Sequence, residues 1–192
     1  MVAGQQGVAI SEAQMVGGVP RGRDRRQRLA VDEDAVAVGK DAIRRIIAVT
    51  TPGHTSNHLC FAYGDALLTG DHVMGWSTTV VVPPDGDMAA YMASLDKLRA
   101  REDRIFYPAH GPPVAKPQQY VRGLIGHRMQ REKQILRLVG EKPRAIPDIV
   151  ANAYPGLDPR LVVAAGGSVN AHLVDLEARG LVGREEDKWT VV

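Results

Sequence analysis

The sequence has few of the features that tie a protein to a membrane, a disulfide framework or a polyanion. It contains one cysteine, Cys60, so no internal disulfide can form. The formal net charge is only +2, which gives no bulk electrostatic reason to expect nucleic-acid or membrane binding. No apolar run approaches the ~18 residues of a membrane span, and the N-terminus lacks the pattern of a secretory signal. We therefore expect a cytoplasmic protein without a membrane partner.

Length and composition predict an ordinary globular chain. The 192 residues, 44% hydrophobic and 24% charged, suffice for one medium core and a small appended domain. Residues 1–30 are rich in Gly, Gln and Arg, show little periodicity, and are expected to be poorly ordered. Their densest charge run, residues 21–28, is interpreted as a solvated loop. A transit-peptide-like segment and a polyanion contact are the alternatives.

Short apolar runs bounded by Gly and Pro predict strands in the first two thirds of the chain. The expected strands are 36–38, 42–50, 59–63, 66–68, 78–82 and 105–107. Asp87 can cap a helix whose apolar face carries Tyr91, Leu95 and Leu98. A long helix is expected over 118–139, ended by Gly140.

The last fifty residues have the pattern of a winged helix-turn-helix. A short helix is expected over 147–154, with Ile149, Val150 and Ala153 inward, and Ser168 can cap a second helix. That second helix carries Val169, Leu173 and Leu176, and a two-stranded ribbon follows. The predicted organisation is a first domain over 1–117, a connecting helix over 118–140 and a winged-helix-like domain over 141–192.

Three turns carry the residues of chemical interest. His54, Asp71 and His110 each lie in a Gly- or Pro-containing turn directly after a short apolar run. A side chain at the end of a strand is held by a rigid sheet and faces an open cleft. Imidazole and carboxylate ligands together suit zinc, and also iron or manganese. The order His, Asp, His therefore predicts a metal site.

These motifs resemble a known family. Thr-Pro-Gly-His54-Thr, Thr-Gly-Asp71 and Tyr-Pro-Ala-His110-Gly-Pro are similar to the later motifs of the metallo-β-lactamase fold. The resemblance is greatest to the branch of hydrolases with a C-terminal winged-helix domain, which includes an endoribonuclease. It implies an α+β fold, an αββα sandwich followed by a small winged-helix domain. The family's earlier His-x-His-x-Asp-His motif is absent, since His54 is the first histidine, and we expect an N-terminally truncated sandwich.

The resemblance also implies roles for the three residues. His54 would bind a first zinc ion, Asp71 would bridge both ions and act as the catalytic carboxylate, and His110 would bind the second. Alternatively, the three converge on a single ion. The implied reaction is attack by metal-bound hydroxide on an ester, thioester, lactam or phosphodiester. A small molecule or an RNA would be the substrate, and a homo-oligomer is possible. The alternative is an inactive remnant that serves as a binding or regulatory module.

Several neighbouring residues have more than one interpretation. His58 and His72 either contact the metal or substrate, or they support the ligands, or they face solvent. Trp76 either walls a substrate cleft or has a core or edge-packing role. Basic residues of the long helix form either a solvated face or a rim that contacts an acidic or phosphate-bearing substrate: Arg122, His127, Arg128, Arg131, Lys133 and Arg137.

The charge of the C-terminal domain argues against a DNA-binding role. Residues 141–192 contain six basic and eight acidic side chains. The helix in the position of a recognition helix carries Asp175 and Glu177, and the ribbon turn is acidic. A DNA-reading face is basic, so no specific DNA binding is expected, and the domain is assigned a packing or lid role.

Overall fold

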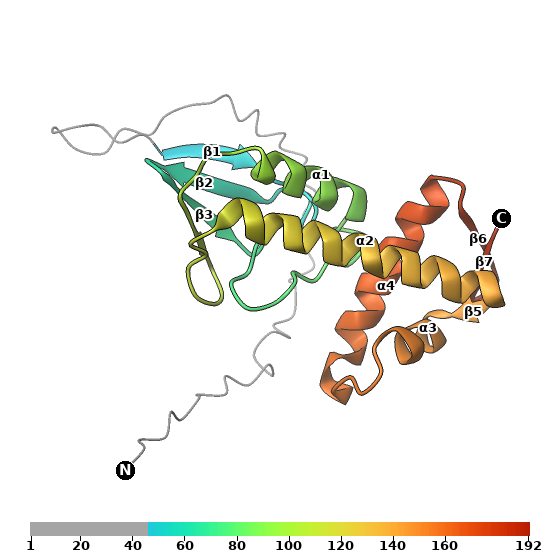
Figure 1. The fold of residues 1–192 in the computed structure, drawn as a ribbon. Helices are drawn as coiled ribbons and strands as arrows, with labels where there is room; N and C mark the ends of the chain where they lie inside the picture. Colours follow the sequence, from blue (N-terminus) through green and yellow to red (C-terminus); the bar gives the residue numbers. More distant parts are fainter. Residues whose placement is uncertain (1–45) are drawn as a thin grey trace, which may run out of the picture. The chain divides into compact units, whose positions relative to one another are not determined.

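A four-stranded sheet is the central element of the first part of the fold (Figure 1). The computed structural model describes residues 46–192. The predicted strand at 36–38, the start of the one at 42–50 and the Arg-rich run lie outside these residues. The sheet order follows the chain order, with antiparallel pairing of the first three strands and parallel pairing of the last two. The strands are β1 (Ile46–Thr50), β2 (Leu59–Tyr63), β3 (Ala66–Gly70) and β4 (Ile105–Pro108).

One face of this sheet is buried and the other is open. Cys60, Leu67 and Phe106 are fully buried on the inner face, whereas Phe61 and Leu68 on the outer face are each more than 40% exposed. This alternation follows from the two-residue period of a strand. It agrees with the strands predicted at 59–63 and 66–68, and Cys60 packs there as a small buried side chain.

Two helices cover the buried face: α1 (Met88–Arg99) and α2 (Pro117–Glu141). The predicted cap of α1 is confirmed, because the Ala90 amide donates to Asp87 Oδ1 at 2.8 Å. Tyr91, Leu95 and Leu98 are fully buried, as expected.

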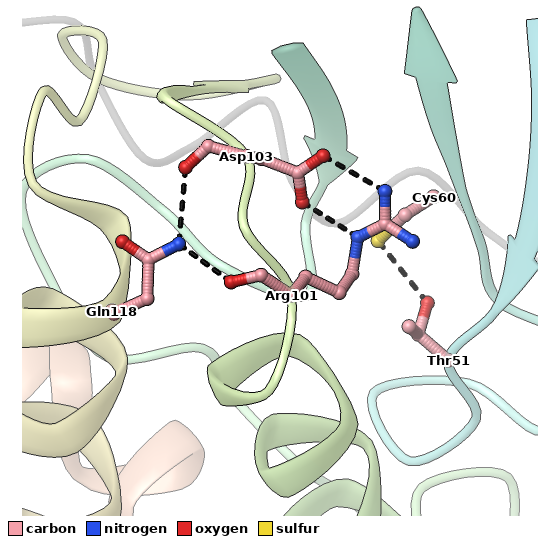
Figure 2. A network of polar contacts seen from close by, with 5 residues as sticks. All are labelled: Thr51, Cys60, Arg101, Asp103 and Gln118. Carbon is pink, nitrogen blue, oxygen red and sulfur yellow. Dashed lines mark hydrogen bonds and ion pairs between the residues drawn. The ribbon is translucent and has the colours of Figure 1, made fainter. Parts of the chain in front are cut away.

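Polar contacts attach the loop that connects α1 to β4 to the first turn of α2. Figure 2 shows Arg101 forming a two-pronged ion pair with Asp103, at 2.6 and 2.8 Å. Gln118 Nε2 donates to the backbone carbonyls of both residues. These bonds satisfy carbonyl groups that no strand or helix uses.

The predicted strand at 78–82 is wrong. Within residues 46–192 this segment pairs with no strand, although Thr79 and Val81 are buried as their β-branched character suggested. Two of its carbonyl groups accept hydrogen bonds from side chains, from Arg128 at Thr79 and from His54 at Val80. Side chains therefore take the place of a strand ladder as partners of these two carbonyl groups.

Helix α2 belongs to two hydrophobic cores. Val121 and Leu124 lie in the core beneath the sheet, whereas Ile135 and Leu138 lie in the C-terminal core. The prediction that Gly140 ends this helix is wrong, since helical structure continues to Glu141. Lys142 then adopts an extended backbone, the conformation favoured before a proline such as Pro143.

The C-terminal part forms the expected winged helix. It comprises β5 (Arg144–Ala145), α3 (Ile146–Ala153), the short 3₁₀ turn η2 (Pro159–Leu161), α4 (Val162–Ala178), β6 (Val182–Glu185) and β7 (Lys188–Val191). The strands form a sheet of order β5-β7-β6, in which β5 was not expected. Ile149, Val150 and Ala153 are buried, as predicted.

Ser168 does not cap α4, contrary to expectation. The helix begins at Val162, and Ser168 is buried within it. Asp158 provides the local cap, because its carboxylate accepts from the Arg160 amide and starts the helical turn that leads into α4. Within residues 46–192 no helix is long and apolar enough to cross a membrane. The domain boundaries at 117/118 and 140/141 stay a prediction.

Candidate metal centre

The three predicted site residues follow strands that end at the same edge of the sheet. β1 runs antiparallel to β2 and β2 antiparallel to β3, so β1 and β3 point the same way. β4 is parallel to β3. The turns that carry His54, Asp71 and His110 therefore leave the carboxyl ends of β1, β3 and β4. Ligand sites of open sheets commonly form at such an edge.

Backbone and side-chain contacts hold the His54 turn in place. Gly53 has a φ of +134°, and a Cβ at this position would lie 2.3 Å from the Tyr91 Cα atom. Only glycine fits this approach to the start of α1. The imidazole Nδ1 of His54 lies 2.7 Å from the Val80 carbonyl oxygen. Since a carbonyl only accepts, Nδ1 donates its hydrogen, and Nε2 of the neutral ring keeps a free lone pair.

Asp71 and His110 are brought together at the ends of β3 and β4. His110 Nε2 lies 3.5 Å from Asp71 Oδ1. The Ala109 amide donates to the Gly70 carbonyl at 3.0 Å, which joins the two turns. Asp71 Oδ1 is buried and has no partner with hydrogen-bond geometry among residues 46–192. A carboxylate oxygen without a hydrogen bond beside an imidazole nitrogen is a donor pair that suits a metal ion.

Two further histidines lie next to this pair, and both are disfavoured as cations. His58 Nδ1 is 2.9 Å from the Thr51 hydroxyl, and burial, followed by the charge of His54, lowers the pKa of His58. His72 is fully buried with its ring 4.6 Å from that of Tyr91, so it does not face solvent. Burial lowers the pKa of His72 to about 3. Gly70, at a φ of +53°, leaves room for the His58 ring, because a Cβ there would lie 2.8 Å from Nε2.

The described residues bring together part of the donor set that the sequence predicts. Asp71 and His110 form a pair, and His54 offers a free nitrogen at the same sheet edge. No group of three or more His, Cys, Asp or Glu residues able to hold a metal lies within 46–192. The donor chemistry therefore fits a metal ion, while the assignment of all three residues as ligands stays a prediction.

The sequence reasoning missed the role of Arg128 by placing it on a basic surface. Arg128 is only 3% exposed, and its guanidinium donates to the Thr79 carbonyl. The helical spacing could have predicted its burial. Arg128 follows Leu124 by four residues and precedes Ile135 by seven, which places it on the apolar stripe of α2. Trp76 is 65% exposed, which excludes its core interpretation.

An open depression elsewhere on the sheet is not this site. It is lined by Gly64, Asp65, Arg101, Glu102 and Asp103. These residues precede β3 and β4, so they lie at the amino ends of those strands, at the opposite edge from Asp71 and His110.

Comparison with known proteins identifies the family. Residues 5–110 match the metallo-beta-lactamase superfamily, and residues 145–189 match the beta-lactamase associated winged helix domain. The chain belongs to the metallo-β-lactamase superfamily. Proteins of this superfamily usually bind metal ions such as zinc or iron, and the family assignment confirms the fold class and the winged-helix domain predicted from the sequence.

Individual relatives cover parts of this metallo-β-lactamase chain. A beta-lactamase-like protein 2 homolog of Drosophila melanogaster is 35% identical over 69% of this chain and 45% of its own length. An atrochrysone carboxyl ACP thioesterase of Aspergillus fumigatus is 38% identical over 59% of this chain and 34% of its own. The crystal structure of a beta-lactamase domain protein from Burkholderia ambifaria has a TM-score of 0.74 at 26% identity, covering 91% of this chain and 54% of that one. The chain thus spans about half the length of such proteins or less.

Proposed function

We propose that this chain forms the metal-binding edge of a metal-dependent hydrolase. The observation that carries the proposal is the Asp71–His110 pair, in which a buried carboxylate oxygen without a hydrogen bond lies 3.5 Å from an imidazole nitrogen. His54 is proposed as the third ligand through Nε2. When bound, a zinc or iron ion polarises a scissile carbonyl or phosphoryl group and lowers the pKa of a water molecule. The substrate bond is an ester, thioester, lactam or phosphodiester.

The residues around the ligands have defined tasks in this proposal. Asp71 supplies the negative charge that offsets the charge of the ion, and its Oδ1 atom is shielded from solvent although the side chain is 40% exposed. The Val80 carbonyl fixes which His54 nitrogen is free. His72 fills the space beneath the site as a neutral ring, which avoids adding a positive charge next to the ion.

A thioester is favoured among the candidate bonds. Fungal relatives that share 35–38% identity with this chain are named atrochrysone carboxyl ACP thioesterases. Trp76 is exposed and directly follows Gly75, whose amide donates to the His110 carbonyl. The indole is therefore available as an apolar wall for an acyl chain beside the ligand turn.

The winged-helix domain is proposed to pack against the catalytic part and not to read DNA. Helix α4, which has the position of a recognition helix, is buried at Ser168, Val169, Ala171, His172, Leu173 and Leu176. Ala171 belongs to the core beneath the sheet, whereas Leu173 belongs to the winged-helix core. Contact with both cores leaves less of α4 free to lie in a major groove, and the acidic Glu177 is on its exposed part.

Zinc titration of the chelator-treated chain tests the metal part of the proposal. We expect calorimetry to show saturable binding that weakens by at least about tenfold in Asp71→Asn and His110→Gln. His127→Gln, which changes an exposed histidine on α2, should bind zinc as the unsubstituted chain does. Equal binding by all four proteins would rule out Asp71 and His110 as ligands.

Hydrolysis assays test the reaction. The zinc-loaded chain should hydrolyse an acyl thioester of N-acetylcysteamine, and the released thiol measures the rate. The Asp71→Asn variant should not hydrolyse this substrate. A nitrophenyl ester of the same acyl group and bis-nitrophenyl phosphate serve as the ester and phosphodiester comparison substrates. A chain that binds no zinc and cleaves none of the three would support the alternative, a non-catalytic binding or regulatory module.

A further inference from the structure

The segment 79–82, which we call the strap, connects the candidate metal centre to the helices. In the described part of the chain it has no strand partner, yet Thr79 and Val81 are buried. Its contacts reach three places: the turn that follows β3, the turn that follows β1, and the helix α2. Through these contacts, the position of α2 constrains the positions of the two turns that carry His54 and Asp71.

Thr79 joins the strap to the Asp71 turn. Its hydroxyl lies 2.6 Å from the Asp71 carbonyl and 3.1 Å from the His72 carbonyl, and donates toward this pair. Tyr91 binds the same turn, with its hydroxyl donating to the His72 carbonyl at 3.1 Å. The backbone that carries Asp71 is therefore held by two buried hydroxyl groups.

Arg128 holds the strap from the side of α2. Its Nη2 donates to the Thr79 carbonyl, and its guanidinium carbon lies 5.2 Å from the centroid of the Tyr91 ring. The side chain is only 3% exposed. A buried guanidinium is costly unless it is compensated, so its place here calls for a function that an apolar residue would not serve.

The next carbonyl along the strap accepts the hydrogen of the His54 ring. The peptide that joins Thr79 to Val80 is planar, so fixing the Thr79 carbonyl leaves only the two backbone dihedrals of Val80 before the Val80 carbonyl. That carbonyl lies 2.7 Å from His54 Nδ1. The other end of the strap is confined as well, because Val82 packs against Gly167 of α4.

We propose that Arg128 is a positioning residue for the metal centre, which aligns the strap so that the Val80 carbonyl holds His54 with Nε2 free and Thr79 holds the Asp71 turn. The inference rests on the proposed function for its purpose, but its geometry does not depend on a bound metal. Arg128 contacts neither substrate nor metal and acts through the two carbonyl groups.

Nitrogen NMR of the histidine rings in the metal-free chain tests this inference directly. At alkaline pH the His54 ring should show a single tautomer with hydrogen on Nδ1, and its signals are assigned by their loss in His54→Gln. In Arg128→Met the ring should populate both tautomers. Arg122→Met, an exposed arginine on the same helix, should leave the His54 signals unchanged. A folded Arg128→Met chain with an unaltered single His54 tautomer would overturn the proposal.

Two further variants keep the test decisive if Arg128→Met does not fold. Thr79→Val removes the hydroxyl but keeps the shape, and should change the Asp71 and His72 backbone amide signals. Arg128→Lys retains a cation able to donate to the Thr79 carbonyl, and should restore most of the Nδ1–H form of His54. The lysine variant could instead fold with a His54 ring that populates both tautomers. That result would show that the charge and the hydrogen bond at residue 128 do not align the strap.

Zinc titration of the same variants separates the two proposals. If Arg128 positions a working metal centre, zinc binding should weaken about tenfold in Arg128→Met and stay unchanged in Arg122→Met. A tautomer change in Arg128→Met without zinc binding by any form of the chain would support the positioning role and contradict the proposed function. Normal zinc binding in all forms with an altered tautomer would contradict the link between Arg128 and the metal.

Discussion

The sheet module, residues 46–116, and the winged-helix module, residues 144–191, use buried polar groups differently. Six of the buried polar side chains in the described part of the chain belong to the sheet module, and they lie in or beside its loops: Thr51, Thr69, His72, Thr79, Ser94 and Asp103. The winged-helix module has two, Ser168 and His172, both on α4. Five of the six form hydrogen bonds within residues 46–192 and His72 does not, so the first module fixes its loops largely with hydrogen bonds, whereas the second is held mainly by its apolar core.

This difference separates the site from its support. Hydrogen bonds are directional and set the position of a backbone carbonyl within a few tenths of an ångström, as a chemical site requires. Apolar packing is not directional and supplies stability. Because α2 contributes to both cores, the winged-helix module can stabilise the sheet module without supplying a ligand.

The largest expected effect contrasts the two faces of the sheet. Phe106→Ala removes a fully buried ring and should lower the free energy of unfolding by about 3–5 kcal/mol. Leu68→Ala on the open face should cost less than about 1 kcal/mol, because that side chain is 47% exposed. Urea titration of both variants measures the difference. Similar losses would mean that the open face is covered in solution.

A substitution at Gly53 tests how rigidly the loops of the sheet module are held. Gly53→Ala would force a Cβ to within 2.3 Å of the Tyr91 backbone at a φ of +134°. We expect a loss of about 2 kcal/mol or more in unfolding free energy, measured by thermal and urea unfolding. An alanine variant as stable as the original chain would show that the His54 turn and α1 can separate freely.

His172, a buried polar residue of α4, should make the stability of the chain sensitive to acid. Burial, followed by the charges of Arg128 and Arg131, lowers the pKa of His172 to about 3. The folded chain then binds this proton less readily than the unfolded chain, so stability is lost as pH falls below the unfolded value of about 6.5. Between pH 7 and pH 5 this one group should remove about 2 kcal/mol.

The variant His172→Leu isolates that contribution. It should lose about 2 kcal/mol less than the original chain over the same pH interval, by urea unfolding at each pH. His127→Gln, at an exposed position of α2, is the matched control. An identical pH dependence in His172→Leu and the original chain would contradict a buried neutral imidazole at this position.

The smallest expected effect concerns the helix that links the two modules. Gly126 lies within α2 and a Cβ there would meet no atom within 4 Å. Gly126→Ala should therefore stabilise the chain by about 0.5–1 kcal/mol, because alanine restricts the unfolded chain and favours helix. A destabilised alanine variant, seen as an earlier thermal transition, would show that α2 bends or moves at this position.

The strand-end turns and the helical faces could be predicted from sequence because their signals are local. Gly and Pro mark the turns around His54, Asp71 and His110, and helical spacing marks Tyr91, Leu95 and Leu98 as inward. Three predictions failed: the strand at 78–82, the helix end at Gly140 and the helix cap at Ser168. In each case the structure around the residues outweighed their local propensity. The cytoplasmic location, the zinc ligands and a homo-oligomer stay predictions.

The sequence by itself determined the order of the elements and the placement of a His or Asp after three strands, because strand and turn propensities act over a few neighbouring residues. Only the tertiary structure decided that Asp71 and His110 meet at 3.5 Å and that Arg128 is buried against the Thr79 carbonyl. Those contacts join residues 39 and 49 positions apart in the chain. No local pattern specifies such distances, which depend on how the sheet and α2 pack against each other.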